Sequence, residues 1–456
     1  MKIHPHDRLL EQFLQSMGSR SRKVLMHLAA CGYCRARLYY LPRPGAAAPD
    51  SERSAGAGVL SWSRPTACGY SEAMLQVEKG VQRVAFQLER ERAEALGLAG
   101  DLLERSPEQR EILLRNCPRF RTWGLYEMLV ERSGEECIRN PARAEELGLL
   151  ALRLSEELDA GKYPEGLIDD LRSRAWSYIG NSRRVRSDLR GAEEAFLTSY
   201  QHLKNGTAEP IERATFLDLK ASLRRDQRRF QDAMRLLRRA VSLFLGAGDS
   251  HRAGRSLVNL ATVYSQSGRP EEGIPSLYRA LELIEPAQEP RLLLCAQHNL
   301  ITLLANSGRY LEAQALYRAT RPLYRSFPDP WTRNRRNWVK GKISRGLGYL
   351  DQAESLFLAA RDGFVAEGVP YDTALVSLEL ATLYAEQGRM AELKKLAGEM
   401  IPIFTAHQIH REALAAFVFL QQATEAEWVG AEIAARVAAY LRRAQHDPAH
   451  RFADEG

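Results

Sequence analysis

Residues 257–281 read LVNLATVYSQSGRPEEGIPSLYRAL, and this stretch decides the fold. Leu260 and Tyr264 are four residues apart, so in a helix their apolar side chains lie on the same face. Gly268 interrupts this pattern, and a second apolar stripe with helical spacing follows the glycine. The stretch therefore predicts two helices joined by a tight turn.

The same pattern recurs every 40 residues through the second half of the chain. Gly268, Gly308, Gly348 and Gly388 are evenly spaced, and one further step back reaches Arg228. A small or apolar residue follows each glycine by five positions, and most units place a large residue four positions later. Strand-like runs of alternating β-branched residues are absent, while Leu, Ala, Glu and Arg dominate. The sequence thus predicts an all-α fold built from repeats.

These units resemble tetratricopeptide repeats, although that family's usual period is about 34 residues. The resemblance implies a solenoid of helical hairpins whose first helices line a concave, partner-binding surface. We expect six such repeats over residues 166–404, capping helices and a tail over 405–456, and a helical lead-in or degenerate repeats over 70–165. Asn140 and Pro141 supply an N-cap and a first-turn proline to one lead-in helix.

Carrying the family's inward-facing positions over to this chain predicts a basic partner-binding surface. Asn181 and His298 fall among these positions, and the candidate binding residues are Arg174, Arg184, Arg225, Arg255, Arg335, Trp338, Lys342 and Arg345. Forked guanidinium groups would suit an acidic peptide or a C-terminal carboxylate. The alternative is that single arginines lie over apolar neighbours or pair with Asp and Glu of adjacent helices.

A candidate metal site stands at the start of the chain. His27, Cys31 and Cys34 have the spacing H-x3-C-x2-C, and His4 and His6 lie upstream. Residues four apart share a helix face, so His27 and Cys31 can bind one ion, and a turn can bring Cys34 to it. A closed tetrahedral site needs a fourth ligand, which either upstream histidine could supply. The pattern predicts one structural Zn²⁺; its alternative is a pair of buried thiols with two incidental histidines.

This N-terminal stretch is similar to the zinc-binding anti-sigma-factor domain, whose motif is an upstream His followed by H-x3-C-x2-C-R. The resemblance places the fourth ligand at His4, so the implied zinc set is His4, His27, Cys31 and Cys34. It covers residues 1–44, and the Gly-, Ala-, Ser- and Pro-rich segment 45–69 reads as a flexible linker. The resemblance implies a sigma factor of the extracytoplasmic-function type as partner, yet the motif runs into the linker without the further helices of that domain.

Charge and hydropathy indicate which kinds of partner and which cellular location to expect. The chain has 456 residues and a net charge of +7, and residues 1–46 hold eight basic and two acidic residues. A basic segment favours an acidic partner, although nucleic acid would also require stacking aromatic residues, which are few here. No apolar run reaches the length of a membrane span and the N-terminus lacks a signal-peptide core, so we expect a cytoplasmic protein without a membrane partner.

The sequence predicts a binding protein rather than an enzyme. The phosphate-binding G-x4-G-K-[ST], zinc-protease H-E-x-x-H and hydrolase G-x-S-x-G motifs are absent. Our leading hypothesis is a bacterial regulatory or adaptor protein that binds a protein or peptide through its repeats and carries a structural zinc module able to bind a sigma factor. The alternative is an interaction scaffold with a purely structural zinc knuckle and no transcriptional role.

Overall fold

The computed structural model describes residues 67–389, 391–396 and 398–399, and every regular element in them is helical. The all-α prediction is confirmed for these residues, while the predicted zinc module and the capping segment lie outside them. The chain forms two compact units. Of the described residues, the first unit contains 67–223 and 245–248, and the second contains 224–244 and 249–399.

The first unit is a series of helices that begins with a long opening helix. α4 begins inside the expected linker, and the helices of this unit are α4 (Ala67–Leu103), α5 (Pro107–Asn116), the 3₁₀ turn η1 (Pro118–Phe120), α6 (Trp123–Glu136), α7 (Pro141–Glu156), α8 (Glu165–Val185), α9 (Leu189–Asn205) and most of α10 (Pro210–Asp226). The opening helix α4 packs on α6, and α6 packs on α7, α7 on α8 and α8 on α9. Asn140 caps α7 as predicted, because its side chain accepts a hydrogen bond from Arg143 N at 3.1 Å. Phe120, Tyr126 and Leu129 are fully buried in the core of this unit.

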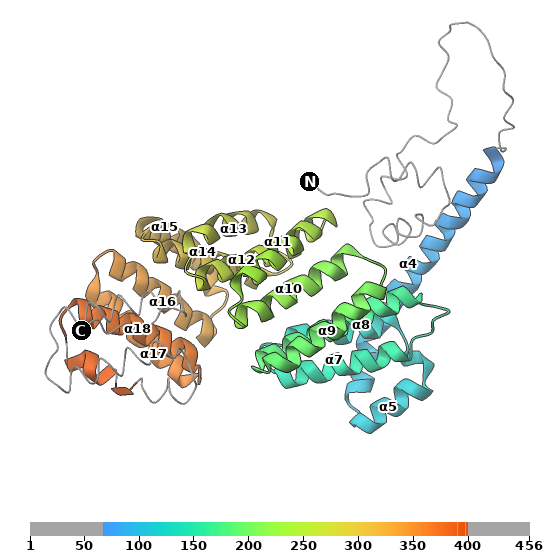
Figure 1. Cartoon of the computed structure of the whole chain (residues 1–456), viewed down its shortest axis with the longest axis horizontal. Coiled ribbons are helices and arrows are strands. Elements are labelled where there is room, and N and C mark those ends of the chain that lie inside the picture. The colour runs from blue at the N-terminus through green and yellow to red at the C-terminus, as the bar shows by residue number, and fades with distance from the viewer. Residues whose placement is uncertain (1–66, 390, 397, 400–456) are drawn as a thin grey trace, which may run out of the picture. The chain divides into compact units, whose positions relative to one another are not determined.

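The second unit repeats a helical hairpin with a constant register. Its first helices are each 17 residues long and start 40 residues apart: α12 (Ser250–Gln266), α14 (Pro290–Asn306), α16 (Pro330–Gly346) and α18 (Pro370–Glu386). The second helices α13 (Pro270–Leu283), α15 (Tyr310–Arg325) and α17 (Leu350–Ala366) follow α12, α14 and α16, and α11 (Phe230–Gly246) precedes α12. Successive first helices contact one another, α12 with α14, α14 with α16 and α16 with α18 (Figure 1). They form the layer that carries the site described below.

Local sequence explains why each hairpin turns at the same place. Gly268, Gly308, Gly348 and Gly388 all have φ between 67° and 85°, the left-handed conformation that ends a helix and that glycine adopts without a Cβ penalty. Proline stands at the first position of α14, α16 and α18, where its missing N–H costs no hydrogen bond. Residues that end a helix and residues that begin one thus alternate along the chain at a fixed spacing.

Small residues let the two helices of a hairpin approach each other. A Cβ built on Gly341 of α16 would lie 2.6 Å from a ring carbon of Phe357 on α17. A Cβ on Gly273 of α13 would lie 2.8 Å from Leu303 and 3.2 Å from the backbone oxygen of Ala261. The alternation of small and large residues seen in the sequence is therefore the packing of one helix into its neighbour.

Arg228 is the one member of this register in which an L-residue replaces the glycine, and its φ is 61°. Its side chain is exposed. We expect Arg228→Gly to raise the free energy of unfolding by up to about 1 kcal/mol, because glycine relieves the left-handed strain at some cost in chain entropy. Gly308→Ala should lower it by about 1 kcal/mol, since the new Cβ meets no atom within 4 Å and only the backbone is strained. Urea unfolding of both variants measures the change, and two shifts of the same sign would contradict this account.

Candidate functional site

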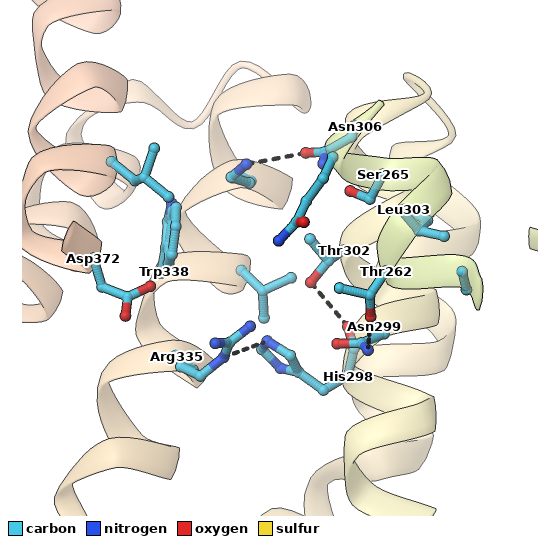
Figure 2. A pocket seen from close by; sticks show the side chains of 15 residues that line it. Thr262, Ser265, His298, Asn299, Thr302, Leu303, Asn306, Arg335, Trp338 and Asp372 are labelled. Carbon is cyan, nitrogen blue, oxygen red and sulfur yellow. Dashed lines mark hydrogen bonds between the residues drawn. The ribbon is translucent and has the colours of Figure 1, made fainter. Parts of the chain in front are cut away.

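A cavity of about 270 Å³ opens within the second unit among the first helices of its hairpins (Figure 2). α12 and α14 supply mainly polar side chains, α16 supplies basic and aromatic ones, and α18 closes one side with Asp372 and Leu375. The residues that line it are Ala261, Thr262, Ser265, Gln266, His298, Asn299, Thr302, Leu303, Asn306, Arg335, Trp338, Val339, Lys342, Asp372 and Leu375.

The repeat register explains why these residues meet. Thr262, Thr302 and Lys342 are 40 residues apart, as are Gln266 and Asn306, and His298 and Trp338. Each group occupies one position of the first helix in successive hairpins, so stacking the hairpins brings its members to the same face. His298, Arg335, Trp338 and Lys342 were predicted from the sequence to lie on this surface, whereas the Thr, Ser, Asn and Gln side chains and Asp372 were not. The 40-residue register was the signal that would have found several of them.

His298 is a neutral hydrogen-bonding centre in the cavity wall. It is 8% exposed, and burial, together with the nearby charges of Arg335 and Lys342, lowers its pKa well below the usual value. Arg335 Nε can only donate, so its 3.4 Å contact to His298 Nε2 leaves the imidazole proton on Nδ1. Nδ1 lies 2.8 Å from the Tyr324 hydroxyl and donates to it. Tyr324 on α15 therefore fixes the orientation of the ring that Arg335 contacts.

Lys342 is held between two neighbouring helices. Its ammonium group donates to Asn306 Oδ1 on α14 at 3.0 Å and pairs with Glu379 on α18 at 2.8 Å. Glu379 also accepts from Arg345 at 3.2 Å. The positive charge of Lys342 is thus balanced by Glu379. The main effect of the side chain is to link α16 to its neighbours α14 and α18.

Trp338 and Asp372 complete the opposite wall. The indole packs edge-on against the buried ring of Phe364, with 6.3 Å between ring centroids, and its Nε1–H is buried without a hydrogen-bond partner among the described residues. Asp372 lies in the first turn of α18, and burial raises the pKa of its carboxyl while Arg335 acts in the opposite direction. The indole ring of Trp338 and the carboxyl of Asp372 thus both line this side of the cavity.

The other candidate basic residues lie outside this cavity, and the structure places several of them in ion pairs. In the first unit, Arg174 donates through Nε to Glu212 at 2.9 Å, and Arg184 donates to Asn181 at 3.0 Å. In the second unit the remaining pairs are Arg225 with Asp226, Arg255 with Glu289, and Arg345 with Glu379 and Glu386. Arg335, Trp338 and Lys342 are the predicted residues that the structure brings together.

The predicted zinc ligands His4, His27, Cys31 and Cys34 fall outside the described residues. The zinc site therefore stays a prediction. Within the described part of the chain, no helix combines the length and apolar character that crossing a bilayer requires.

Comparison with known proteins supports the repeat assignment. The tetratricopeptide repeat family model matches residues 211–286, so the chain contains repeats of this type. A Rap protein solved in complex with competence and sporulation factor has a TM-score of 0.51 and 12% identity, over 71% of this chain and 97% of that one. Aspartyl phosphate phosphatase F from Bacillus subtilis has a TM-score of 0.50 and 13% identity, over 90% and 96%. At these identities the likeness shows the fold alone. No curated protein sequence matches the chain.

Proposed function

We propose that this protein is a cytoplasmic adaptor or regulator that binds an extended peptide, free or part of a partner protein, in the cavity of the second unit. The observation that carries the proposal is the cavity itself, on which polar side chains from successive first helices converge. Polar side chains that recur at a regular spacing can hydrogen-bond the regularly spaced backbone groups of an extended peptide. Each hairpin would then contact successive residues of the peptide.

The structural neighbours are consistent with this role. A Rap protein was solved with competence and sporulation factor bound, which shows that a helical-repeat protein with this fold takes a ligand. For the present chain we propose binding without catalysis. Among the residues that the structure describes, no nucleophile in the cavity is hydrogen-bonded to a base: His298 contacts Tyr324 and Arg335, and Ser265 has no general base as a hydrogen-bond partner.

The proposal is tested with a matched pair of tryptophan substitutions. Ser265 lines the cavity on α12, whereas Ser355 is exposed on α17 outside it. A display library of random peptides is selected on the full-length protein. We expect the selected peptides to bind Ser265→Trp at least about ten-fold more weakly than the wild type, because the indole fills the cavity, and to bind Ser355→Trp unchanged. Selection of no peptide, or equal binding to both variants, would refute peptide binding in this cavity.

We further propose that residues 1–44 hold one zinc ion through His4, His27, Cys31 and Cys34, on the strength of the motif. We expect one equivalent of zinc in purified protein by elemental mass spectrometry. Cys31→Ser with Cys34→Ser should abolish it, and Cys295→Ser, outside the motif, should not. Less than one equivalent in the wild type would end the zinc proposal. A sigma-factor partner rests on the same motif, and its test is recovery of a sigma factor on wild-type protein but not on the double variant.

A further inference from the structure

The excess positive charge of the second unit lies in the segment that forms α15 and α16. Residues 310–346 contain nine Arg and Lys but two Asp and Glu, whereas the rest of residues 224–399 contain 17 of each kind. Both carboxylates of the segment pair with an arginine outside it. Glu312 pairs with Arg309 at 2.6 Å, and Asp329 pairs with Arg291 at 2.9 Å. The nine cations are therefore not balanced within their own helix pair.

Six of the nine basic side chains form a face outside the cavity. Of the other three, Arg335 and Lys342 line the cavity, and Arg345 is neutralised by two carboxylates. The remaining six, which we call the α15–α16 basic face, are Arg318, Arg321, Arg325, Arg333, Arg336 and Lys340. None of them lines the cavity or forms an ion pair with any residue that the structure describes. Their charge is available to a partner.

The spacing of these residues places three of them on one side of each helix. The three on α15 are exposed and follow one another at intervals of three and four residues, and the three on α16 repeat that spacing. Each set spans seven residues, about 10 Å along its helix. The ring of Tyr310, at the start of α15, fills the space that a Cβ of Gly346 at the end of α16 would need. The two helices therefore run antiparallel, with the two sets at the same level.

Tyr317 on α15 shows that the two sets meet. Burial raises the pKa of its phenol, while the nearby charges of Arg336 on α16 and Arg321 on α15 act to lower it. Guanidinium groups from both helices are therefore close to one ring, and no carboxylate among the described residues pairs with either of them. Like charges held close together repel each other, and a bound anion would remove this repulsion.

The composition of the basic face favours phosphate groups over a protein surface. Five of the six cations are arginines, whose planar guanidinium can donate two hydrogen bonds to one phosphate. Stable protein interfaces centre on apolar and aromatic anchors. Among the described residues of this segment, the exposed large apolar side chains are Leu311, at one end of α15, and Trp331, which packs against Phe364. The face therefore offers charge without an apolar centre.

We propose that the α15–α16 basic face binds the phosphate backbone of a nucleic-acid duplex without reading its base sequence. A duplex presents about six phosphate charges over 10 Å of its axis, and it is bound without the stacking aromatic residues that single strands use. Phosphate contacts carry no direct sequence information. The inference does not depend on peptide binding in the cavity, because no residue of the face lines that cavity.

The experiment measures how the full-length protein binds a fluorescein-labelled DNA duplex of about 20 base pairs, by fluorescence anisotropy between about 50 and 200 mM NaCl. The face variant combines Arg321→Gln, Arg325→Gln and Arg336→Gln. We expect it to bind about 10- to 100-fold more weakly at the lowest salt. The slope of log K against log salt should become shallower by about 2 to 3, because three phosphate contacts are lost. A duplex of unrelated sequence should give the same affinities within about 3-fold.

A matched control removes the same amount of charge elsewhere. Arg105→Gln, Arg139→Gln and Arg213→Gln are combined in one variant, and all three side chains are exposed in the first unit. Both triple variants keep the basic residues of segment 1–46 and have the same net charge, so they differ in the position of the lost charges. We expect the control to bind the duplex within about 2-fold of the wild type. Equal losses in the two triple variants would overturn the inference.

A second variant keeps the test decisive if the first does not fold, which circular dichroism checks. Arg318→Gln with Lys340→Gln removes two other charges of the face and should make the salt slope shallower by about 2. No binding of the duplex to the wild type at the lowest salt would also overturn the inference. A labelled polyglutamate peptide is the competing probe: if the face binds it and not the duplex, the partner is an acidic protein instead.

Discussion

Phe357→Ala should lower the free energy of unfolding by about 3 to 5 kcal/mol, the largest single-residue effect that we expect in the repeats. The Phe357 ring is fully buried between α17 and α16, and it occupies the space left by the missing Cβ of Gly341. Removing the ring leaves a cavity that rigid helices cannot close. Urea unfolding followed by circular dichroism measures the change. Val365→Ala on the same helix is the control, because Val365 is 54% exposed and should change stability by less than about 0.5 kcal/mol.

A double-mutant cycle tests the physical reason for this effect. In the wild type, Gly341→Ala places a methyl group against the Phe357 ring and should be destabilising. In the Phe357→Ala background the same change meets no ring, so its cost should fall. The two substitutions should therefore be coupled, with the double variant more stable than the sum of the single changes predicts. Simple additivity would show that the contact between Gly341 and Phe357 does not determine the packing.

Glu91→Ala should have the second largest effect, a loss of about 3 kcal/mol, because it removes the shared acceptor of a buried network in the first unit. Glu91 on α4 is 2% exposed. It accepts from the Tyr163 hydroxyl at 2.9 Å and Gly124 N at 3.4 Å, and it pairs with Lys162 at 2.7 Å. The variant leaves these donors without their acceptor. Glu94→Ala is the matched control, since Glu94 is exposed on the same helix and its pair with Arg90 is worth little.

The Glu91 network also predicts a pH dependence. Burial acts to raise the pKa of Glu91, but hydrogen bonds from Lys162, Gln87 and Tyr163 outweigh it and hold the pKa below its ordinary value. A carboxyl whose pKa is lowered by folding stabilises the protein above its unfolded pKa of about 4.3, and that contribution is lost as the pH falls through the folded pKa. The stability difference between wild type and Glu91→Ala should be constant from pH 7 to pH 5 and shrink below about pH 4. A difference that grows on acidification would contradict the assigned network.

The sequence was sufficient to predict the helical hairpins because their signals are local. Gly308 and Gly348 mark a backbone conformation that few other residues adopt, and proline at the start of α14 and α16 marks the next helix. Arg228 shows that the register persists even where glycine is replaced. These features depend on neighbouring residues along the chain, so they can be predicted without knowing which helices pack against each other.

The candidate site was less predictable because its chemistry depends on pairing between helices. Arg335 and Arg345 stand on the same helix, yet Arg345 is neutralised by Glu379 and Glu386 whereas Arg335 contacts neutral His298. The register shows which face of a helix a side chain occupies, but it does not show which carboxylate reaches it from the next hairpin. The carboxylates that pair with Arg345 are 34 and 41 positions away, so a search for opposite charges at this separation would recover part of the pattern.

The constant register of the first helices has a consequence for how the proposed ligand specificity of this cavity can change. Each hairpin presents the same few positions to the cavity, and the backbone signals that shape the hairpin, its glycine turn and its starting proline, stand elsewhere in the repeat. Substitution at positions equivalent to Thr262, His298 or Arg335 can therefore alter recognition without touching the residues that make the hairpin fold. The positions that determine ligand specificity are therefore separate from those that determine folding. Specificity can diverge during evolution while the hairpin fold is kept.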